Sequence, residues 1–255
     1  MNILSIGNSF SQDAHRYLHN IAKADRYALN TFNIVIGGCS LSTHYRNMMG
    51  EVCAYALEMN GESTGFKVSI KEALLSRDWD IITVQQVSWA SPDYETYQPY
   101  LNEIISYIRR MVPKAKIALH YTWAYEQNSK RLNEELGYKN RSEMYADIVK
   151  SYNMAAKEID VDFIIPSATL FEKLTESGVE KIHRDTFHAS FGIGRYALGL
   201  LWYSVISGND ITENNYSDFD EEISAVEIDT AKKCVKNMMD KYKGDRVKAE
   251  ILNEK

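Results

Sequence analysis

A short apolar stretch near the start of the chain ends abruptly in small polar residues. Residues 3–6 read Ile-Leu-Ser-Ile, and Gly7, Asn8 and Ser9 follow them directly. Strands of a parallel sheet are covered on both faces and are therefore almost wholly apolar. Ligands of open α/β sheets bind just beyond the carboxyl ends of such strands. We therefore expect a buried strand that delivers Ser9 to an active-site turn, with Ser11 capping the helix that follows.

A serine in such a turn has two interpretations, because most connections of this kind between a strand and a helix catalyse nothing. A second stretch favours catalysis: residues 184–190 read Arg-Asp-Thr-Phe-His-Ala-Ser. This spacing lets Asp185 accept a hydrogen bond from Nδ1 of His188, while Nε2 faces outward to take a proton from Ser9. A base that is oriented by a carboxylate is the arrangement that activates a serine nucleophile.

With these two motifs the sequence resembles the SGNH hydrolase superfamily, also called the GDSL-like lipases and esterases. The resemblance rests on Gly-Asn-Ser-Phe-Ser after the first strand and on Asp-x-x-His late in the chain, and it covers residues 2 to about 206. It implies that Ser9 is the nucleophile and an oxyanion-hole donor, that His188 is the base, and that Asp185 orients the base. It implies neither a metal nor a cofactor.

Two positions depart from the pattern of the superfamily. Asn8 stands where the name GDSL implies Asp, and the usual Gly-x-Asn-Asp after the third strand is replaced by a segment that contains Gln85 and Gln86. A glutamine amide can donate the same kind of hydrogen bond as asparagine, and carbohydrate-acetylesterase branches also carry a Gln here. We therefore expect Gln86, or else Gln85, to serve the oxyanion hole; glutamines that merely close a buried strand are the alternative. Gly38 matches the remaining family glycine and would offer its backbone N–H.

Four further segments read as strands that alternate with helical segments. They are residues 31–36, 81–84, 116–120 and 161–165. This alternation predicts a three-layer α/β/α sandwich around a five-stranded parallel sheet with right-handed crossovers, and the resemblance makes it flavodoxin-like. Asn60-Gly61 predicts a β-hairpin insertion at about 53–70, placed on a helical layer as a lip of the cleft or as a contact in a homo-oligomer. We expect one domain over residues 1–255, with a charged tail at about 243–255.

Aromatic residues follow several of the expected strands and make candidate substrate contacts. Trp89 follows the glutamines, Trp123 follows the fourth strand, and His44 follows the Gly pair after the second. Aromatic rings beside a polar cleft suit stacking on sugars, although aromatic lids and a merely solvated His44 are alternatives. The expected substrate is therefore a small-molecule ester, with a short acyl group on a carbohydrate. A lipase or thioesterase, and a noncatalytic carbohydrate-binding protein on an esterase scaffold, are the other candidates.

The composition argues against several other functions. A net charge of −6 without a concentrated basic segment argues against nucleic acid as a partner. No apolar run approaches the roughly 20 residues that span a bilayer, and no leader with a charged start and an apolar centre precedes the first strand. The three cysteines lack the paired spacing of a zinc site or of a disulfide framework, so we expect reduced thiols and a cytoplasmic location. Nucleotide-binding glycine motifs are absent.

Overall fold

The strand that contains residues 3–6 lies in the middle of the sheet. The computed structural model describes residues 1–242, and its first strand, β1, runs from Asn2 to Gly7. The sheet order is β4-β3-β2-β1-β5-β6-β7, so β1 has strands on both sides. Ile3, Leu4 and Ile6 have no exposed surface. The expectation of a first strand covered on both faces is confirmed.

The parallel part of the sheet contains the five strands that the sequence predicts. Besides β1 they are β2 (Asn30–Val35), β5 (Ile81–Val84), β6 (Lys116–His120) and β7 (Phe163–Ile165). In the ladders Gly7 pairs with Val35, and Ile6 pairs with Val84. This register brings the carboxyl ends of β1, β2 and β5 to the same edge of the sheet.

The whole sheet is mixed and has seven strands, so the expected purely parallel, five-stranded sheet is wrong. The predicted hairpin is present as β3 (Tyr55–Met59) and β4 (Glu62–Val68), but it does not lie on a helical layer. Strand β3 pairs antiparallel with β2 and so extends the sheet. The pairing satisfies backbone groups that an edge strand would leave open. Asn60 and Gly61 form the connection with φ of 54° and 83°, as a tight hairpin turn requires.

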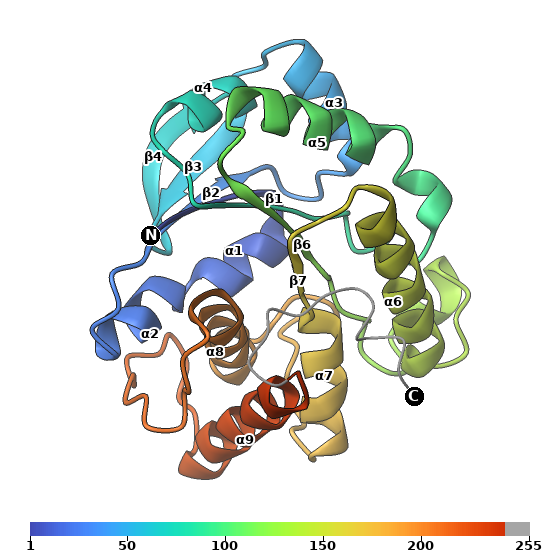
Figure 1. Ribbon diagram of the computed structural model, residues 1–255. Helices are drawn as coiled ribbons and strands as arrows, with labels where there is room; N and C mark the ends of the chain where they lie inside the picture. The colour runs from blue at the N-terminus through green and yellow to red at the C-terminus, as the bar shows by residue number, and fades with distance from the viewer. Residues whose placement is uncertain (243–255) are drawn as a thin grey trace.

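Helices cover both faces of this sheet (Figure 1). One layer contains α3 (Leu41–Met49), α4 (Ile70–Leu75) and α5 (Tyr100–Met111). The other contains α1 (Ser9–His15), α2 (Leu18–Ala24), α7 (Ser167–Glu176), α8 (Ile193–Ser207) and α9 (Ala225–Lys241). Helix α6 (Arg141–Glu158) packs against α7 beside β7, and two short helical turns, η1 (Tyr94–Thr96) and η2 (Arg131–Glu135), lie in the connections. The three-layer arrangement is the one expected.

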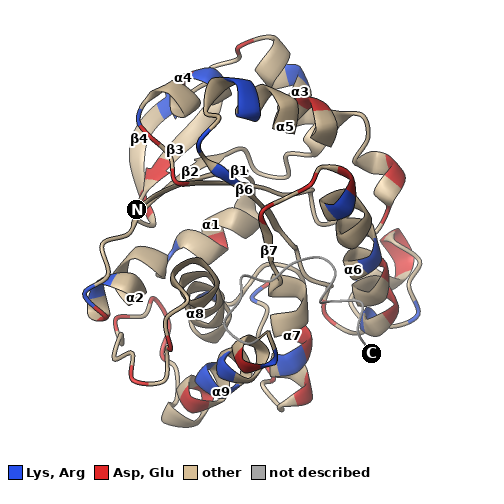
Figure 2. Cartoon of the chain, viewed as in Figure 1, with Lys and Arg blue, Asp and Glu red and all other residues tan. Residues whose placement is uncertain are grey.

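Lys and Arg are interspersed with Asp and Glu along α6 and α9 (Figure 2). In α9, Lys233 pairs with Asp229 at 2.6 Å and Lys236 with Asp240 at 2.7 Å. Exposed pairs of this spacing add only tenths of a kcal/mol to the stability of a helix. They therefore do not determine where α9 packs. Over residues 1–242 no helix is long and apolar enough to cross a membrane. The predicted charged tail lies outside the described residues.

Two histidines are buried in the polar interior between the sheet and α8. Nε2 of His15 lies 2.7 Å from the hydroxyl of Ser5. His120 is bonded through Nδ1 to Oε1 of Gln85 at 2.7 Å and through Nε2 to the hydroxyl of Ser167 at 3.0 Å. Burial lowers the pKa of both histidines to about 3. Both rings are therefore neutral in the folded protein at neutral pH.

The two buried histidines predict that the fold loses stability at pH values well above those at which carboxylates titrate. An unfolded histidine has a pKa near 6.5. Below that pH the unfolded chain therefore binds protons at these two positions, whereas the folded chain does not. Stability should be constant from pH 8 to 7 and fall as the pH drops from 6.5 toward 3. At pH 5 the loss is roughly 2 kcal/mol for each such histidine.

Urea denaturation of the wild type and of His120→Gln at pH 7 and pH 5 checks this expectation. The substitution removes one titrating ring and leaves all carboxylates in place, so the variant should lose roughly 2 kcal/mol less than the wild type between these pH values. Equal losses in the two proteins would show that His120 takes up its proton in the folded state.

Candidate active site

Three side chains from opposite ends of the sequence meet at the edge where β1 ends. The Oγ atom of Ser9 lies 2.8 Å from Nε2 of His188, and Nδ1 of the same ring lies 2.7 Å from Oδ2 of Asp185. The backbone N–H of His188 also donates to Oδ1 of Asp185, at 2.9 Å. The residues of the two sequence motifs are thus joined in one chain of hydrogen bonds, in the order that the spacing predicts.

The carboxylate determines which nitrogen of the imidazole carries the proton. Burial raises the pKa of Asp185, but the side-chain and backbone hydrogen bonds from His188 lower it further, so the net pKa lies below its usual value. An ionised Asp185 can only accept hydrogen bonds. Nδ1 of His188 must therefore carry the proton, and Nε2 is left as the acceptor for the hydroxyl of Ser9. This is the state that a general base needs.

Asn8 fixes the turn that presents Ser9. Its Oδ1 accepts the backbone N–H of Phe10 at 3.1 Å, which makes Asn8, and not the predicted Ser11, the N-cap of α1. Its Nδ2 donates to the carbonyl of Cys39 at 3.1 Å. One buried amide thus ties the end of β1 to the loop after β2. Ser9 becomes the first residue of α1, where the helix dipole favours negative charge.

Two backbone N–H groups are free to stabilise such a charge. Within residues 1–242 neither Ser9 nor Gly38 donates its backbone N–H to a protein group. Gly38 is exposed with φ of +64°, a conformation that favours glycine, and a Cβ atom there would meet nothing within 4 Å. The Gly38 loop therefore leaves open space beside the turn. Preorganised donors of this kind hold the oxyanion of acyl-transfer reactions.

Comparisons with known proteins place this architecture. A family model described as a domain of unknown function (DUF4886) matches residues 2–238. A crystal structure of a DUF4886 family protein from Bacteroides uniformis ATCC 8492 is 33% identical, with a TM-score of 0.88, and the match covers 98% of this chain and 97% of that one. The chain belongs to the DUF4886 family.

More distant structures share the fold of this DUF4886 chain. A candidate SGNH hydrolase from Slackia heliotrinireducens matches with a TM-score of 0.60 at 18% identity, over 80% of this chain and 97% of that one. A candidate GDSL-like lipase from Parabacteroides merdae ATCC 43184 matches with a TM-score of 0.54 at 13% identity, over 79% and 93%. No curated protein matches the sequence. The DUF4886 chain has a divergent SGNH hydrolase fold.

Gln86 does not occupy the place expected of an oxyanion donor. The two N–H bonds of its amide are taken by the carbonyl and the hydroxyl of Thr96, at 3.0 and 3.1 Å. Its Oε1 accepts the backbone N–H groups of Leu41 and Val87, at 3.0 and 2.9 Å. Both the nitrogen and the oxygen of this buried amide are therefore already bonded within the protein. In the DUF4886 chain it instead joins the loop after β5 to η1 and to the start of α3.

Gln85, the other candidate, lies beneath the turn that carries Ser9. Its Nε2 donates to Oδ1 of Asn8 at 2.8 Å, and its Oε1 accepts from Nδ1 of His120 at 2.7 Å. The side chain is 2% exposed. Gln85 supports Asn8 from below and does not face the cleft, so the alternative of a glutamine pair that closes a buried strand describes the structure better.

Two of the three predicted substrate contacts are also wrong. His44 is fully buried, with Nδ1 2.8 Å from the hydroxyl of Tyr55. Trp123 is fully buried as well, and its Nε1 donates to the carbonyl of Phe187 at 2.8 Å. Neither ring can touch a ligand, although Trp123 supports the loop that carries His188. Trp89 alone is open to solvent, with 55% of its surface exposed in the loop after β5.

Two residues beside His188 could not be assigned to the site from sequence patterns. The ring of Phe187 lies 3.9 Å from that of His188, centre to centre. The exposed guanidinium of Arg131, on η2, lies 4.0 Å from the centre of the Phe187 ring. Residues 127–141 are mostly polar and charged, and nothing in their pattern distinguishes Arg131. The structure places this positive charge close to the loop that carries His188.

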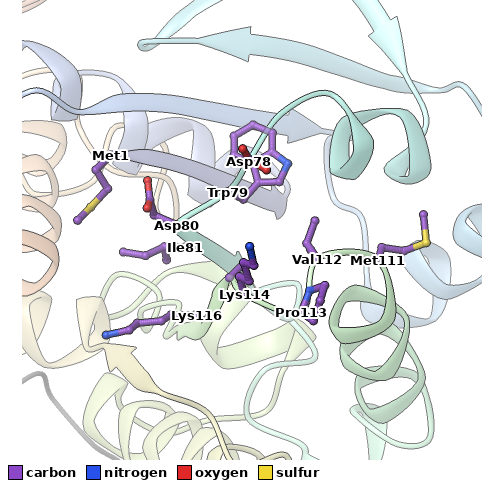
Figure 3. A pocket seen from close by; sticks show the side chains of 11 residues that line it. Met1, Asp78, Trp79, Asp80, Ile81, Met111, Val112, Pro113, Lys114 and Lys116 are labelled. Atoms are coloured by element: carbon purple, nitrogen blue, oxygen red, sulfur yellow. The ribbon is translucent and has the colours of Figure 1, made fainter.

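Two other features lie away from this site. A hollow of about 670 Å³ opens where β1, β5 and β6 begin, and Figure 3 shows Asp78, Trp79 and Lys114 among the residues that line it. The strands run away from this edge, so the hollow lies at the opposite end of the sheet from Ser9. Among the described residues, no group of three His, Cys, Asp or Glu side chains is placed to hold a metal ion.

The contacts of Gln86 predict that its replacement by Ala harms the fold more than the chemistry. Two buried N–H groups, those of Leu41 and Val87, would lose their acceptor, so we expect a loss of about 2 kcal/mol in the free energy of unfolding. Loss of an oxyanion donor would instead lower turnover by about 100- to 1000-fold. Urea denaturation and the rate of labelling by a fluorophosphonate separate these effects. A 100-fold drop in the labelling rate at unchanged stability would instead show that Gln86 is an oxyanion-hole donor.

Proposed function

We propose that this protein is a serine esterase in which Ser9 attacks the carbonyl carbon of a carboxylic ester. The observation that carries the proposal is the chain of hydrogen bonds from Ser9 through His188 to Asp185, with distances of 2.8 and 2.7 Å. The hydroxyl lies at a helix N-terminus beside free backbone N–H groups, which suits acyl transfer. The shared fold with candidate SGNH hydrolases agrees with this reaction class.

The mechanism follows from the positions of these groups. As the hydroxyl oxygen of Ser9 forms its bond to the carbonyl carbon, Nε2 of His188 takes the proton and Asp185 stabilises the imidazolium. The backbone N–H groups of Ser9 and Gly38 hold the negative oxygen. Collapse of this intermediate expels the alcohol, which receives the proton from His188. Water then attacks the acyl-enzyme by the same route and releases the acid.

We infer that the substrate is a small molecule with a short acyl group, such as an acetylated carbohydrate. The support is the exposed indole of Trp89, which lies in the loop after β5, at the same edge of the sheet as Ser9. An open aromatic face beside a polar site suits stacking on a sugar ring. Gln86, which the resemblance linked to carbohydrate esterases, adds no support because its amide is already bonded.

An activity-based probe tests the nucleophile without any assumption about the substrate. We expect a fluorophosphonate to label the wild type on one serine, and Ser9→Ala to remove the label completely. Asp185→Asn should lower the labelling rate by about four orders of magnitude, because the imidazole would be held in the wrong tautomer. Ser42→Ala is the matched control and should label like the wild type. Labelling that survives Ser9→Ala would identify another nucleophile.

A comparison of esters tests the substrate class. We expect acetate release from acetylated sugars to exceed hydrolysis of esters with longer acyl chains. Trp89→Ala should raise KM for the acetylated sugars by about tenfold, the effect of losing one stacking contact of about 1.4 kcal/mol, and should leave the hydrolysis of p-nitrophenyl acetate unchanged. A preference for long acyl chains would point to a lipase or thioesterase. Glycan binding by a protein that hydrolyses no ester would point to a noncatalytic binding protein.

A further inference from the structure

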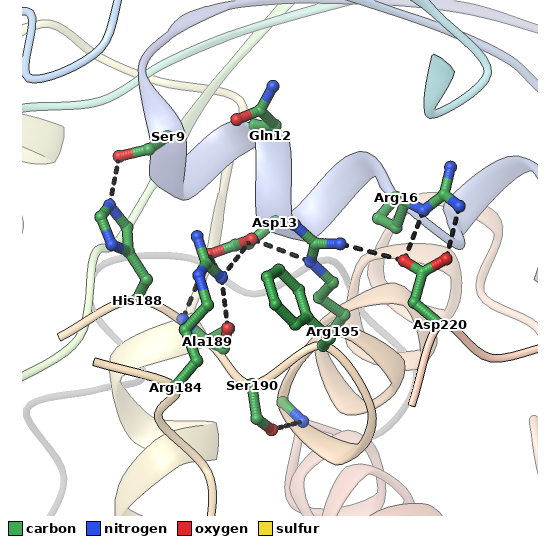
Figure 4. Close-up of polar contacts among 12 residues, drawn as sticks. Ser9, Gln12, Asp13, Arg16, Arg184, His188, Ala189, Ser190, Arg195 and Asp220 are labelled. Atoms are coloured by element: carbon green, nitrogen blue, oxygen red, sulfur yellow. Dashed lines mark hydrogen bonds and ion pairs between the residues drawn. The ribbon is translucent and has the colours of Figure 1, made fainter. Parts of the chain in front are cut away.

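A buried carboxylate lies one helical turn beyond the proposed nucleophile. Asp13 follows Ser9 by four residues on α1, so the two side chains are on the same face of the helix. Figure 4 shows both of them directed toward the segment that carries His188. The side chain of Asp13 has no exposed surface. A carboxylate in such a place must be compensated by several donors.

The donors come from the catalytic segment itself and from the start of α8. Nη1 of Arg184 lies 2.8 and 2.9 Å from the two carboxylate oxygens of Asp13, and the backbone N–H of Ala189 donates to Oδ2 at 3.1 Å. Nε of Arg195, on α8, donates to Oδ1 at 2.9 Å. Burial raises the pKa of Asp13 above its usual value, and the charges of Arg195 and Arg184 offset part of this rise.

These contacts hold both ends of the Asp-x-x-His segment. Arg184 immediately precedes Asp185, and Ala189 immediately follows His188. The segment is closed on itself, because the backbone N–H of Arg184 donates to the carbonyl of His188 at 3.0 Å. Asp13 therefore connects the closed segment to the same short helix that bears Ser9.

The segment needs such external support. Thr186, at its centre, has φ of +76°, a conformation that is strained for a β-branched residue. About 45% of the Asp185 side chain is exposed, so apolar packing does not hold that end. Phe187 packs against the core at the centre of the segment, and polar contacts from outside hold its two ends. Asp13 makes two of these contacts, with Arg184 and with Ala189.

We propose that Asp13 is a positioning residue that fixes the distance between Ser9 and His188, an inference that rests on the proposed esterase function. Stability alone is a weak reason for the cluster, because well-packed apolar residues often stabilise a core better than a buried ion pair does. A carboxylate adds directional contacts: its two oxygens accept hydrogen bonds from the side chain of Arg184 and from the backbone N–H of Ala189. The distance from helix to base is thereby set by two bonds at fixed geometry.

Asp220 provides a matched control within the same cluster. It pairs with Arg195 at 3.0 Å and with Arg16 at 2.5 Å. It therefore touches the cluster from its outer side and makes no contact with the segment from Asp185 to His188 (Figure 4). Asp220→Asn removes a charge from the network and leaves the hydrogen bonds of Asp13 in place.

Asp13→Asn tests the proposal, with p-nitrophenyl acetate as substrate. The amide has the same shape but turns two N–H bonds toward donors, so the segment should shift away from Ser9. We expect kcat to fall on the order of 100-fold, as for a misplacement of about 1 Å, with KM changed less than twofold. Asp220→Asn should retain kcat within threefold. Wild-type turnover in Asp13→Asn, or an equal loss in Asp220→Asn, would overturn the proposal.

A double-mutant comparison separates positioning from a general structural defect. In a His188→Ala background there is no base left to place, so Asp13→Asn should not change the residual rate further. An unchanged 100-fold effect there would show a merely structural role. If Asp13→Asn does not fold, Arg184→Gln replaces it, with an expected tenfold loss in kcat and the same non-additivity.

A readout without substrate keeps this test separate from the esterase proposal. The proton on Nδ1 of His188, shared with Asp185 at 2.7 Å, should give a low-field NMR signal that His188→Ala removes. We expect Asp13→Asn to broaden or abolish this signal and Asp220→Asn to leave it intact. A sharp signal in Asp13→Asn would refute the positioning role. Failure of the wild type to react with any ester or fluorophosphonate would refute the esterase proposal instead.

Discussion

The register of the parallel ladders is the constraint on which the site depends. Because Gly7 pairs with Val35 and Ile6 with Val84, three strands end at one edge of the sheet. The next residues of each strand are then close neighbours, which is why one amide, that of Asn8, can reach from the end of β1 to the carbonyl of Cys39 after β2. The ladder thus places the turn that carries Ser9 next to the Gly38 loop before any side chain of the site contributes.

Below that edge, a directed chain of hydrogen bonds supports the turn from inside the core. The hydroxyl of Ser167 donates to His120, whose Nδ1 donates to Gln85, whose amide donates to Asn8. Each group in this series of hydrogen bonds is buried, and each donor faces an acceptor. The series therefore rigidifies the turn at little cost in desolvation. The neutral state of His120 is a condition of this polarity, since a protonated ring could not accept from Ser167.

Local sequence patterns predicted those features of the fold and of the site that depend on neighbouring residues. They failed for features that depend on partners distant in the sequence. The spacing of Asp185 and His188 and the apolar run that precedes Ser9 are short-range signals, and the structure has the corresponding geometry. The hairpin around Asn60 was visible, but its pairing with β2 was not, because a turn does not determine which strand it joins. Gln86 offered the right chemical group, yet its hydrogen bonds go to Thr96, which no spacing rule connects to it.

Asp13 is a second case in which contacts with distant residues could not be predicted from the local sequence: here a residue expected at the surface is buried. Read along the sequence, it is one acidic residue on an amphipathic helix, and solvent exposure is the usual outcome for such a residue. Its burial follows only from the meeting of α1 with residues 184–195, which are separated from it by most of the chain. A buried carboxylate needs hydrogen-bond donors from the segments that pack against it. Its contacts therefore show which segments are held at a fixed distance from one another. Here they are the helix that carries Ser9 and the two ends of the segment that carries His188.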